Sequence, residues 1–372
     1  MNTTLKNISL LHFKNYEQVQ LTCSPGINCL VGKNGMGKTN FLDAIYYLCM
    51  TKSHFSTPDA SIIQHGADFF RMEAQFELGR IEQGFVVKYQ ARKKKVFENN
   101  QVPYDKLAEH IGRLPVVMIA PDDSLLATDG SEIRRKFIDN TLSQIDQDYL
   151  SQLMLYNKLL KQRNALLKKM AEENRYQKEL LLVYDQQMAP AADFIFQKRS
   201  NFAEVLLPVF QVMHDYICRK EEAVQLSYKS QLQEKDIEGL FKDAREKDRI
   251  LQRTTTGIHK DDLIFQIEGR PLKRFASQGQ LKSYILALKL SQFEILRQYK
   301  EQIPILLLDD IFDKLDQHRV KQLLELLHQP NFGQVFITDT NPNRVARIID
   351  KLDVEQRQFL VEDSKVSELP LF

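Results

Sequence analysis

The sequence has few cysteines and histidines, and neither occurs in a pattern that would build a disulfide framework or a zinc site. Its four cysteines, at positions 23, 29, 49 and 218, include no C-x-x-C pair and have no histidine cluster beside them. The eight histidines are scattered along the chain and show no metal-ligand spacing. We therefore expect reduced, mostly buried thiols, which are typical of a cytosolic protein.

Long apolar runs and an excess of one charge are also missing. No apolar run approaches the roughly 20 residues that span a bilayer, and residues Met1 to Lys6 lack the apolar core of a signal peptide. We therefore expect no membrane association. Lysines and arginines number 51 against 49 aspartates and glutamates, a net charge of +2, so any surface for nucleic acid has to be a local patch. The 372 residues suffice for two or three domains.

What the sequence does contain is a glycine-rich motif near its N-terminus. The motif fits the pattern G-x-x-x-x-G-K-[ST] and consists of Gly32, Lys33, Asn34, Gly35, Met36, Gly37, Lys38 and Thr39. The residues before it, Ile27 to Val31, are strand-like although Asn28 interrupts them, and Asn40 to Leu48 after it are apolar at helical spacing. Strand, glycine-rich turn and helix are the context in which this motif binds phosphate.

Each residue type in the motif suits that role. Glycines let successive backbone N–H groups point at phosphate oxygens, and the following helix adds the positive end of its dipole. Lys38 would reach the β- and γ-phosphates, and Thr39 would offer its hydroxyl to Mg²⁺. The alternative is a chance match in a glycine-rich turn, which the flanking strand and helix patterns argue against. We therefore predict a nucleoside triphosphate site.

The rest of the first 130 residues is mostly strand-like. Alternating apolar residues predict two strands before residue 28 and two more over residues 68–79 and 84–91. The apolar run Val116 to Ile119 predicts a central strand. The densest cluster of positive charge in the chain has two possible interpretations. It is the solvated end of a hairpin, or it contacts DNA phosphates. Its members are Arg92, Lys93, Lys94 and Lys95.

From about Ser131 to Lys220 the apolar spacing becomes helical. It predicts two antiparallel helices of about 20–30 residues with apolar residues at heptad spacing, and Arg163 takes one position of their seam. Pro190 is expected to kink the second helix. Strand, helix and strand are predicted over 223–228, 237–251 and 263–265. Asp261 and Asp262 are adjacent and face opposite sides of an extended chain, so a turn is a better interpretation than a metal site.

Two features of the C-terminal part would complete a nucleotide site. A short polar loop, Ser277, Gln278, Gly279 and Gln280, precedes a helix predicted over 281–296, and helix N-termini bind anions. An apolar strand from Ile303 to Leu308 ends in Asp309 and Asp310. We expect Asp309 to hold Mg²⁺ beside the phosphate loop and Asp310 to polarise the attacking water. A helix through residue 327 and a last core strand over 335–340 follow.

The order of these motifs resembles the ABC-type ATPase heads of the SMC and Rad50 group, and within that group the RecF family of bacterial recombination mediators. The resemblance covers essentially the whole chain, and its carriers are residues 12–16 (HFKNY), 32–39, 120–123 (APDD), 134–139 (RRKFID), 257–262 (GIHKDD), 276–280 (ASQGQ) and 307–310 (LLDD). It implies an α/β fold: an ABC-type P-loop ATPase head of mixed sheets with helices, and a helical, short coiled-coil-like second lobe inserted in it.

The resemblance also implies how the chain is divided and how it works. Residues 1–130 would carry the P-loop, 131–250 the helical lobe, and 251–372 the signature loop, the Walker B strand and the D-loop. ATP and Mg²⁺ would bind, and two copies would form a head-to-tail homodimer. Ser277 and Gly279 of one copy would contact the γ-phosphate held by the other, with Asp316 at the dimer contact.

The same resemblance implies the partners and the location. The family binds double-stranded and single-stranded DNA, favours gap junctions, and works with RecO and RecR to load RecA in the bacterial cytoplasm. ATP would close the dimer on DNA, and hydrolysis would release it. Two alternatives are an ATP-gated nuclease, which needs a further domain with a carboxylate cluster, and an SMC-like tether, which needs long heptad arms.

Some positions depart from the family pattern. Ile258 and Lys260 replace the proline and arginine of Gly-Pro-His-Arg-Asp-Asp, and Phe55 stands where arginine is frequent. Asp310 replaces the glutamate usual in ABC heads, which predicts slow hydrolysis because the shorter side chain reaches water less well. Thr338 and Asp339 are both candidates for sensing the γ-phosphate.

Overall fold

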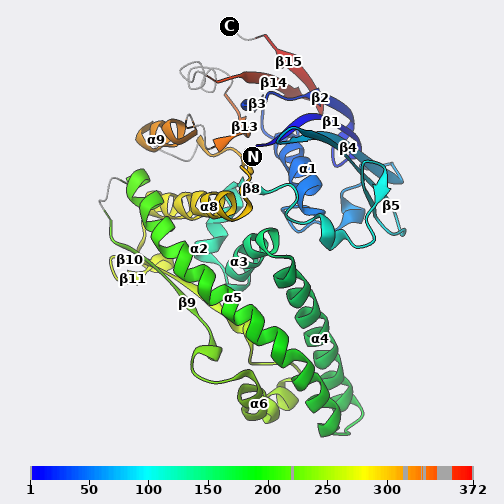
Figure 1. Cartoon of the computed structure of the whole chain (residues 1–372), viewed down its shortest axis with the longest axis vertical. Helices are drawn as coiled ribbons and strands as arrows, with labels where there is room; N and C mark the ends of the chain where they lie inside the picture. Colours follow the sequence, from blue (N-terminus) through cyan, green and yellow to red (C-terminus); the bar gives the residue numbers. More distant parts are fainter. Residues whose placement is uncertain are drawn as a thin grey trace. The chain divides into compact units, whose positions relative to one another are not determined.

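The structure is a computed structural model that describes residues 2–218, 222–312, 317–327, 329, 332–341 and 354–370. The chain divides into two compact units (Figure 1). The first comprises Met1–Ser124, Met213–Lys220 and Gln278–Phe372, and the second Leu125–Val212 and Glu221–Ser277. This division differs from the predicted boundary at residue 250, because β10 and the residues before it pack with the helical lobe.

The first unit contains an antiparallel sheet and a largely parallel one. The antiparallel sheet has the order β2-β1-β4-β5-β6-β7. Its strands are β1 (Thr3–Phe13), β2 (Tyr16–Thr22), β4 (Phe69–Leu78), β5 (Ile81–Gln90), β6 (Val96–Asn99) and β7 (Val102–Pro103). These strands agree with the alternating pattern in the sequence, since buried and exposed residues alternate along much of β2 and β4.

The second sheet has the order β15-β14-β3-β13-β12-β8, and only β15 runs antiparallel to its neighbour. Its strands are β3 (Ile27–Val31), β8 (Val116–Ile119), β12 (Ile305–Leu308), β13 (Val335–Asp339), β14 (Gln356–Glu362) and β15 (Lys365–Leu369). β3, β8, β12 and β13 are buried at every residue, as parallel strands covered on both faces should be.

Three sequence predictions about this sheet were wrong. β8 is the last strand in the sheet order and not a central one, because an apolar run reports burial on both faces and says nothing about the number of neighbours. β13 is not the last core strand, since the hairpin of β14 and β15 follows it and β14 pairs with β3. Asn28 does not interrupt β3, because its side-chain amide closes the preceding turn through two hydrogen bonds with the backbone of Ser24.

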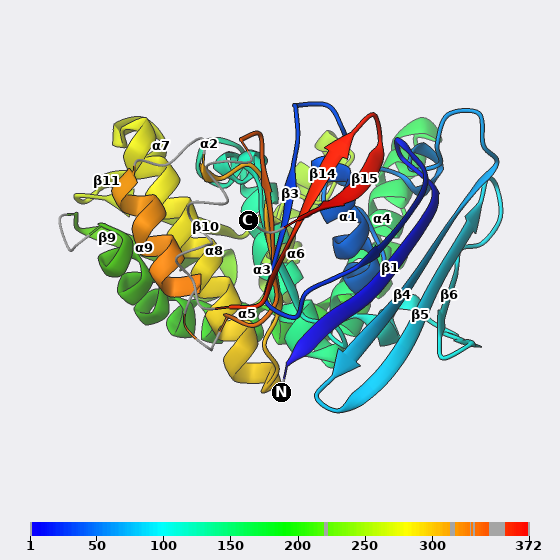
Figure 2. The same ribbon diagram turned by 90° about the horizontal axis from the view of Figure 1, so that it is seen from above.

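Helix α1 (Lys38–Met50) lies between the two sheets of the first unit (Figure 2). It contacts β4 on one side and β8 and β13 on the other, and eleven of its thirteen residues are buried. A helix that is apolar on all sides suits such a position. The ring of Tyr47 packs edge-on against Phe13 and Phe70 of the antiparallel sheet. Helix α8 (Gln278–Lys300) contacts β8, and α9 (Gln317–Leu327) also belongs to this unit.

The second unit is mainly helical and has a small antiparallel sheet of order β11-β10-β9. Its helices are α2 (Leu125–Thr128), α3 (Ser131–Ile145), α4 (Gln147–Glu172), α5 (Lys178–Cys218), α6 (Ile237–Leu251) and α7 (Leu272–Phe275). Its strands are β9 (Val224–Lys229), β10 (Asp262–Ile267) and β11 (Arg270–Pro271). At 41 residues α5 is longer than predicted, and it includes Pro190 and Pro208 without ending at either.

Short 3₁₀ helices occur in both units. They are η1 (Asp59–Ser61), η2 (Leu107–His110), η3 (Pro121–Ser124), η4 (Gln231–Gln233) and η5 (Ile258–Lys260). All four cysteines are free and buried, as the sequence predicted. None of the described helices combines the length and the apolar character that crossing a membrane requires.

Candidate nucleotide site

The glycine-rich loop leaves β3 and enters α1 at one edge of the parallel sheet. Because Val31 pairs with Asp339 of β13 and Leu360 of β14, the loop begins between those two strands. Gly32 N–H donates to the carbonyl of Asp339 at 3.2 Å, and a Cβ at Gly32 would lie 2.2 Å from the carbonyl oxygen of Val361. With a φ of +155° as well, position 32 favours glycine over any residue with a side chain.

The first turn of α1 is free of side-chain caps. Gly37 is the N-cap residue at φ +117°, and no side chain accepts a hydrogen bond from the N–H groups of this helix end. A Cβ at Gly37 would lie 2.5 Å from Nδ2 of Asn15. Uncapped N–H groups at a helix N-terminus form an anion site, so the turn can accept a phosphate.

Lys38 is buried and folds back over the loop. Its Nζ donates to the carbonyls of Gly32 at 2.9 Å and Lys33 at 3.1 Å. No carboxylate lies within 4.0 Å of this ammonium among the described residues. The positive charge is therefore satisfied only by neutral backbone dipoles, which a phosphate can replace.

Thr39 and Asp309 meet across the sheet. Thr39 Oγ1 lies 2.9 Å from both carboxylate oxygens of Asp309 and donates to them. The register explains the contact on the other side of the carboxylate: Leu308 pairs with Ile337, so Asp309 follows beside Thr338, whose hydroxyl donates to Oδ1 at 2.7 Å. The two residues that the sequence predicted as metal ligands are thus neighbours.

The carboxyl of Asp309 lies in a setting that a cation would stabilise. Burial raises its pKa, hydrogen bonds from Thr338 and Thr39 oppose the rise, and the charge of Asp310 adds to it. Carboxylate and hydroxyl oxygens are the ligands that Mg²⁺ prefers. Thr39 and Asp309 therefore fit a magnesium ion by donor type and by proximity.

Asp310 is fixed by its backbone. Its φ of +46° is left-handed, and its N–H donates to Thr338 Oγ1 at 2.9 Å. One hydroxyl, that of Thr338, therefore holds both members of the Asp309–Asp310 pair. The sequence named Thr338 only as an alternative γ-phosphate sensor and gave no sign of this contact, which joins residues 28 and 29 positions apart.

Residues of the β1–β2 turn support the loop from the antiparallel sheet. Tyr16 OH donates to the carbonyl of Gly37 at 2.8 Å. Asn15 Nδ2 donates to the carbonyl of Met36 at 3.1 Å, and Asn15 Oδ1 accepts from Asn40 at 2.7 Å. The family resemblance contained both residues in HFKNY, but no local pattern assigned them to the phosphate loop.

Asp43, which the sequence analysis missed, organises the connection after α1. It is fully buried and accepts hydrogen bonds at 2.7 Å from Ser53 Oγ and from the N–H of His54. Lys14 forms an ion pair with it at 2.7 Å and lies 5.3 Å from the centroid of the Phe55 ring. Asp43 thereby joins α1, the β1–β2 turn and the polar connection at 52–59.

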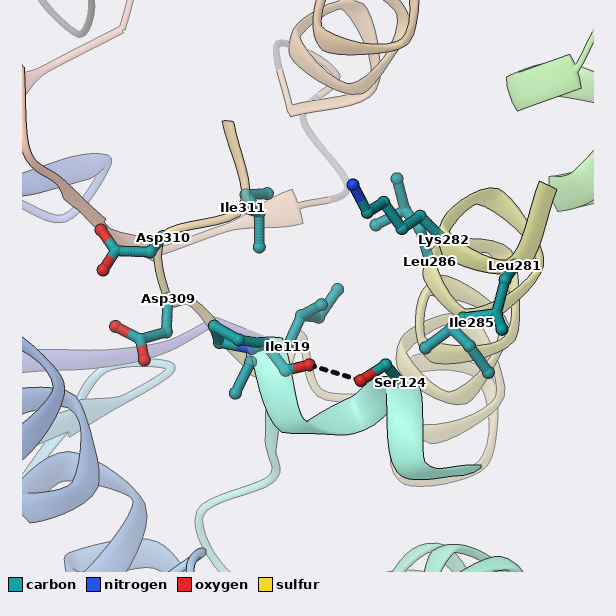
Figure 3. A pocket seen from close by; sticks show the side chains of 11 residues that line it. Ile119, Ser124, Leu281, Lys282, Ile285, Leu286, Asp309, Asp310 and Ile311 are labelled. Carbon is teal, nitrogen blue, oxygen red and sulfur yellow. Dashed lines mark hydrogen bonds between the residues drawn. The ribbon is translucent and has the colours of Figure 1, made fainter. Parts of the chain in front are cut away.

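A small cavity lies behind the two aspartates (Figure 3). Its volume is about 70 Å³, far below the roughly 300 Å³ at which ligand pockets begin, so it is too small for a nucleotide. In Figure 3 the carboxylates of Asp309 and Asp310 point away from the side chains of α8. The residues that line the cavity are Ile119, Ala120, Pro121, Ser124, Leu281, Lys282, Ile285, Leu286, Asp309, Asp310 and Ile311.

The predicted signature loop lies at the start of α8. Ser277 and Gln278 are exposed, and Gly279 and Gln280 are half-buried. Their contact with the nucleotide of a second copy stays a prediction. Asp316, the predicted D-loop residue, lies outside the described residues.

The predicted basic cluster at 92–95 is not one surface. Arg92, Lys93 and Lys94 are exposed, but Lys95 forms an ion pair with Asp59 at 2.9 Å and donates to Tyr47 OH at 2.8 Å. Only one tenth of the Lys95 side chain is exposed. The turn thus directs the Lys95 side chain inward, whereas contact of Arg92, Lys93 and Lys94 with DNA stays a prediction.

Asp261 ends the 3₁₀ turn η5 and its N–H donates to the carbonyl of Ile258, which agrees with the predicted turn, and both aspartates also bind arginines. Asp261 is buried and accepts from Arg199 at 2.8 Å and from Tyr228 OH at 2.5 Å. Asp262 forms a two-bond ion pair with Arg134, at 2.6 and 3.0 Å. Arg163, predicted at the helical seam, is fully buried and bonds to Asp185 and Asp248. These carboxylates are the anchors of the second unit.

Comparison with known proteins places these features in a family. A family model described as "RecF/RecN/SMC N terminal domain" matches residues 4–361. The chain is 44% identical over 366 residues to the DNA replication and repair protein RecF of Phocaeicola vulgatus, covering 98% of both proteins. It is 46% identical over 345 residues to the protein of the same name in Flavobacterium johnsoniae, covering 93% of this chain and 96% of that protein.

Solved structures agree. The chain is similar to the recombination mediator protein RecF bound to ATP, from the RecFOR pathway, with a TM-score of 0.88 and 29% identity over 99% of this chain and 98% of that one. The Smc head domain of Pyrococcus furiosus, at 16% identity and a TM-score of 0.56, shares the fold.

Proposed function

Because this chain belongs to the RecF/RecN/SMC N-terminal domain family, we propose that it is an ATP-dependent DNA-binding protein of replication and recombinational repair. In this proposal ATP closes two copies head to tail on DNA, and slow hydrolysis releases them. The relatives named DNA replication and repair protein RecF support the biological role. The similarity to RecF bound to ATP supports the nucleotide.

The single observation that carries the proposal is the meeting of Lys38, Thr39 and Asp309 at one end of the parallel sheet. Residues 270 positions apart in the chain come within 2.9 Å, beside a bare helix N-terminus. Lys38 and Asp309 are buried and Thr39 is half-buried. A phosphate can replace the partners of Lys38, and a cation can replace the hydrogen bond between Thr39 and Asp309. This arrangement suits a nucleoside triphosphate with its metal.

Each residue has a role in binding. The N–H groups of the loop and of the first turn of α1 would hold the β- and γ-phosphates, and Lys38 would neutralise their charge. Thr39 and Asp309 would hold Mg²⁺, which supplies positive charge to the phosphate oxygens where negative charge develops. Asn15 and Tyr16 keep the loop in shape from behind.

Hydrolysis would depend on Asp310. We assign it the orientation and polarisation of the attacking water, because it neighbours Asp309 and its backbone is fixed by Thr338. Aspartate is one methylene shorter than the glutamate of other ABC heads and would hold the water less well. Slow hydrolysis suits a switch that must remain closed on DNA while other proteins act.

The nucleotide would be completed by a second copy. Ser277 and Gly279 would contact the γ-phosphate of the partner, and the exposure of Ser277 and Gln278 in one copy supports this assignment. ATP binding then controls the dimer, since only the triphosphate reaches both surfaces. DNA, RecO and RecR are the further partners that membership of the family supports.

The test is DNA binding with and without nucleotide. The chain should bind a gapped duplex several-fold more tightly with ATP and Mg²⁺ than with ADP, and the variant Lys38→Met should show the weaker affinity with either nucleotide. Equal affinity for DNA with ATP, with ADP and without nucleotide would contradict the proposal. Cleavage of the DNA by the purified protein would instead favour a nuclease.

A further inference from the structure

The loop between α6 and β10 is held rigidly by the second unit. Thr254 donates through its N–H and its hydroxyl to Asn164 of α4, both at 2.7 Å. Thr255 donates in the same way to Asp248, at 2.8 and 2.7 Å. Gly257 has a φ of +112°, and a Cβ there would lie 2.6 Å from Tyr156 OH. The loop therefore has one conformation that the surrounding helices impose.

His259 adds a neutral anchor under the same loop. Its Nε2 lies 3.2 Å from the carbonyl of Thr254, which can only accept, so Nε2 carries the proton. Nδ1 then accepts from Tyr156 OH at 2.9 Å. Burial, with a smaller contribution from the charges of Lys260 and Arg135, lowers the pKa of His259 to about 4, against the opposing effect of the hydrogen bond to Thr254. The histidine is neutral near pH 7 and contributes no charge of its own.

The carboxylates beneath this loop are all engaged by arginines of the interior or of α3. Asp248 pairs with Arg163 at 2.7 Å and Asp261 pairs with Arg199 at 2.8 Å. Asp262 pairs with Arg134. None of these three carboxylates forms an ion pair with a cation on the outer side of the loop, although the charge of Asp248 raises the pKa of Lys260.

Four cations surround the loop, and we call them the cation cluster: Arg135, Lys247, Arg253 and Lys260. Lys247, Arg253 and Lys260 are exposed and Arg135 is half-buried. None of the four has a carboxylate within 4.0 Å among the described residues, although Arg135 donates to Ser131 Oγ and to the carbonyl of Asp261. Burial lowers the pKa of Lys260, the charges of Arg253, Arg135 and Lys247 lower it further, and the charge of Asp248 opposes them. Because Arg135 bonds to the carbonyl of the residue after Lys260 and Arg253 precedes the anchored Thr254, these cations lie around the same loop, and Lys260 is repelled by the other three.

A scaffold role does not account for this arrangement. Cations are favourable near a helix C-terminus, which explains Lys247 in the last turns of α6. Lys260 and Arg135 come from other elements, and the repulsion among them is unfavourable without an anion. Although the net charge of the chain is only +2, four cations with no ion pair to any described residue lie around one loop.

We propose that the cation cluster is a phosphate-binding surface for the backbone of nucleic acid, with Lys260 and Arg253 as its central contacts. The proposal rests on the proposed function, because it assigns a surface to the DNA partner of that function. This surface is separate from residues 92–95, which the sequence left open between a solvated hairpin end and a contact with DNA phosphates. Phosphodiesters fit because they carry one negative charge each and can be contacted by side chains from several elements.

The surface extends along one face of α4. Asn164 holds Thr254, and Lys161 and Lys168 lie about one turn before and after it at helical spacing, so they share its side of the helix. Both are exposed and neither forms an ion pair among the described residues. A backbone that contacts Arg253 can therefore continue past these two lysines.

The experiment measures the affinity of the full chain with ATP for a duplex of about 30 base pairs and for a single strand of the same length, over a range of salt. The slope of log K against log salt should fall by about 1 in Lys260→Ala and by about 2 in Lys260→Ala/Arg253→Ala. ATP affinity and melting temperature should be unchanged. Lys242→Ala is the matched control, since Lys242 is exposed on α6 and lies about 140° around the helix from Lys247.

Two results would overturn the proposal while leaving the proposed function standing. The first is wild-type DNA binding with an unchanged slope in the double variant on both DNA forms. The second is poly-L-glutamate that competes as well as DNA at equal charge and loses its binding in the same variants, which would assign the surface to an acidic protein. A wild-type chain that binds ATP but no DNA would contradict both the cation cluster and the proposed function.

Discussion

The phosphate loop of the first unit and the helical seam of the second use buried charge in opposite ways. At the loop, Lys38 is 4% exposed and Asp309 3% exposed, and neither has an oppositely charged group within 4.0 Å among the described residues. At the seam, Arg163 is 0% and Arg199 1% exposed, and each forms ion pairs with two aspartates. Buried charge is left for a ligand in one region and neutralised within the protein in the other.

The helix ends show the same difference. The N-terminus of α1 has no side-chain cap, whereas Asp146 and Asp236 cap α4 and α6 through their carboxylates. An N-cap aspartate contributes about 1 kcal/mol to stability. Helix α1 lacks this contribution, and its free N–H groups can bind an anion instead. In the first unit, polar groups without a protein partner therefore occur where a ligand would bind.

The largest expected effect is on the stability of the second unit. Arg163→Met should lower the free energy of unfolding by about 3–5 kcal/mol, because it leaves Asp185 and Asp248 buried without their partner. Denaturant unfolding followed by circular dichroism measures the change, with Lys242→Met as the exposed control. A loss below about 1 kcal/mol would show that the ion pairs of the seam are not what holds it together.

The next effect is on ligand binding with little change in stability. Lys38→Met should lower ATP affinity about 100-fold, or about 3 kcal/mol, because the ammonium that meets the phosphates is lost. The free energy of unfolding without ATP should change by less than about 1 kcal/mol, since Lys38 donates only to two backbone carbonyls. Calorimetry with ATP and unfolding without it separate the two. If Lys38→Met unfolded readily and still bound ATP, Lys38 would serve the stability of the fold and not the binding of the ligand.

The sequence predicts the phosphate loop better than the residues that surround it. The phosphate loop and the Asp309–Asp310 strand are contiguous motifs, so their ligand-binding residues can be read in order along the chain. Their neighbours cannot: Thr338, Asn15 and Asp43 reach the site through strand register and packing between distant segments. The position of β14 beside Gly32 is another long-range result that no local pattern contains.

The second unit was predicted less well, because its charges act through contacts that the sequence does not pair. Arg163 was placed at the seam by its spacing, but its partners, Asp185 and Asp248, lie 22 and 85 residues away. The sequence predicts the turn at Asp261 and Asp262 but not the arginine that each carboxylate binds.

In the first unit, the direction of the Lys95 side chain could not be predicted either. It depends on a turn, in which Arg92 has a φ of +65°, and on the distant Asp59.

A third effect concerns protons in the second unit. Burial lowers the pKa of His259 from its usual 6.5 to about 4, so the unfolded chain binds more protons between these values. Stability should fall as the pH drops through this window, by roughly 2 kcal/mol between about pH 7.5 and about pH 5 for this one residue. His259→Gln should remove that part of the pH dependence, whereas His65→Gln, at an exposed position, should not. Denaturant unfolding at both pH values measures this change in the free energy of unfolding. If that free energy changed equally with pH in the two variants, the burial of His259 would not be its cause.

The smallest effect tests the divided basic cluster. Lys95→Ala should lower the free energy of unfolding by about 1 kcal/mol, because it removes a partly buried ion pair with Asp59 and a hydrogen bond to Tyr47. Lys94→Ala, one residue away and exposed, should leave stability unchanged. If Lys94→Ala destabilised the protein as much as Lys95→Ala, the inward direction of Lys95 would be wrong.

The central claim is that the phosphate loop is half of a nucleotide site and that a second copy completes it. Light scattering with ATP and Mg²⁺ tests it most directly. The wild-type chain should have the mass of a dimer with ATP and of a monomer with ADP, and Lys38→Met should remain a monomer. Ser277→Arg should bind ATP with wild-type affinity and also remain a monomer. A wild-type chain that is saturated with ATP and still monomeric would contradict the claim.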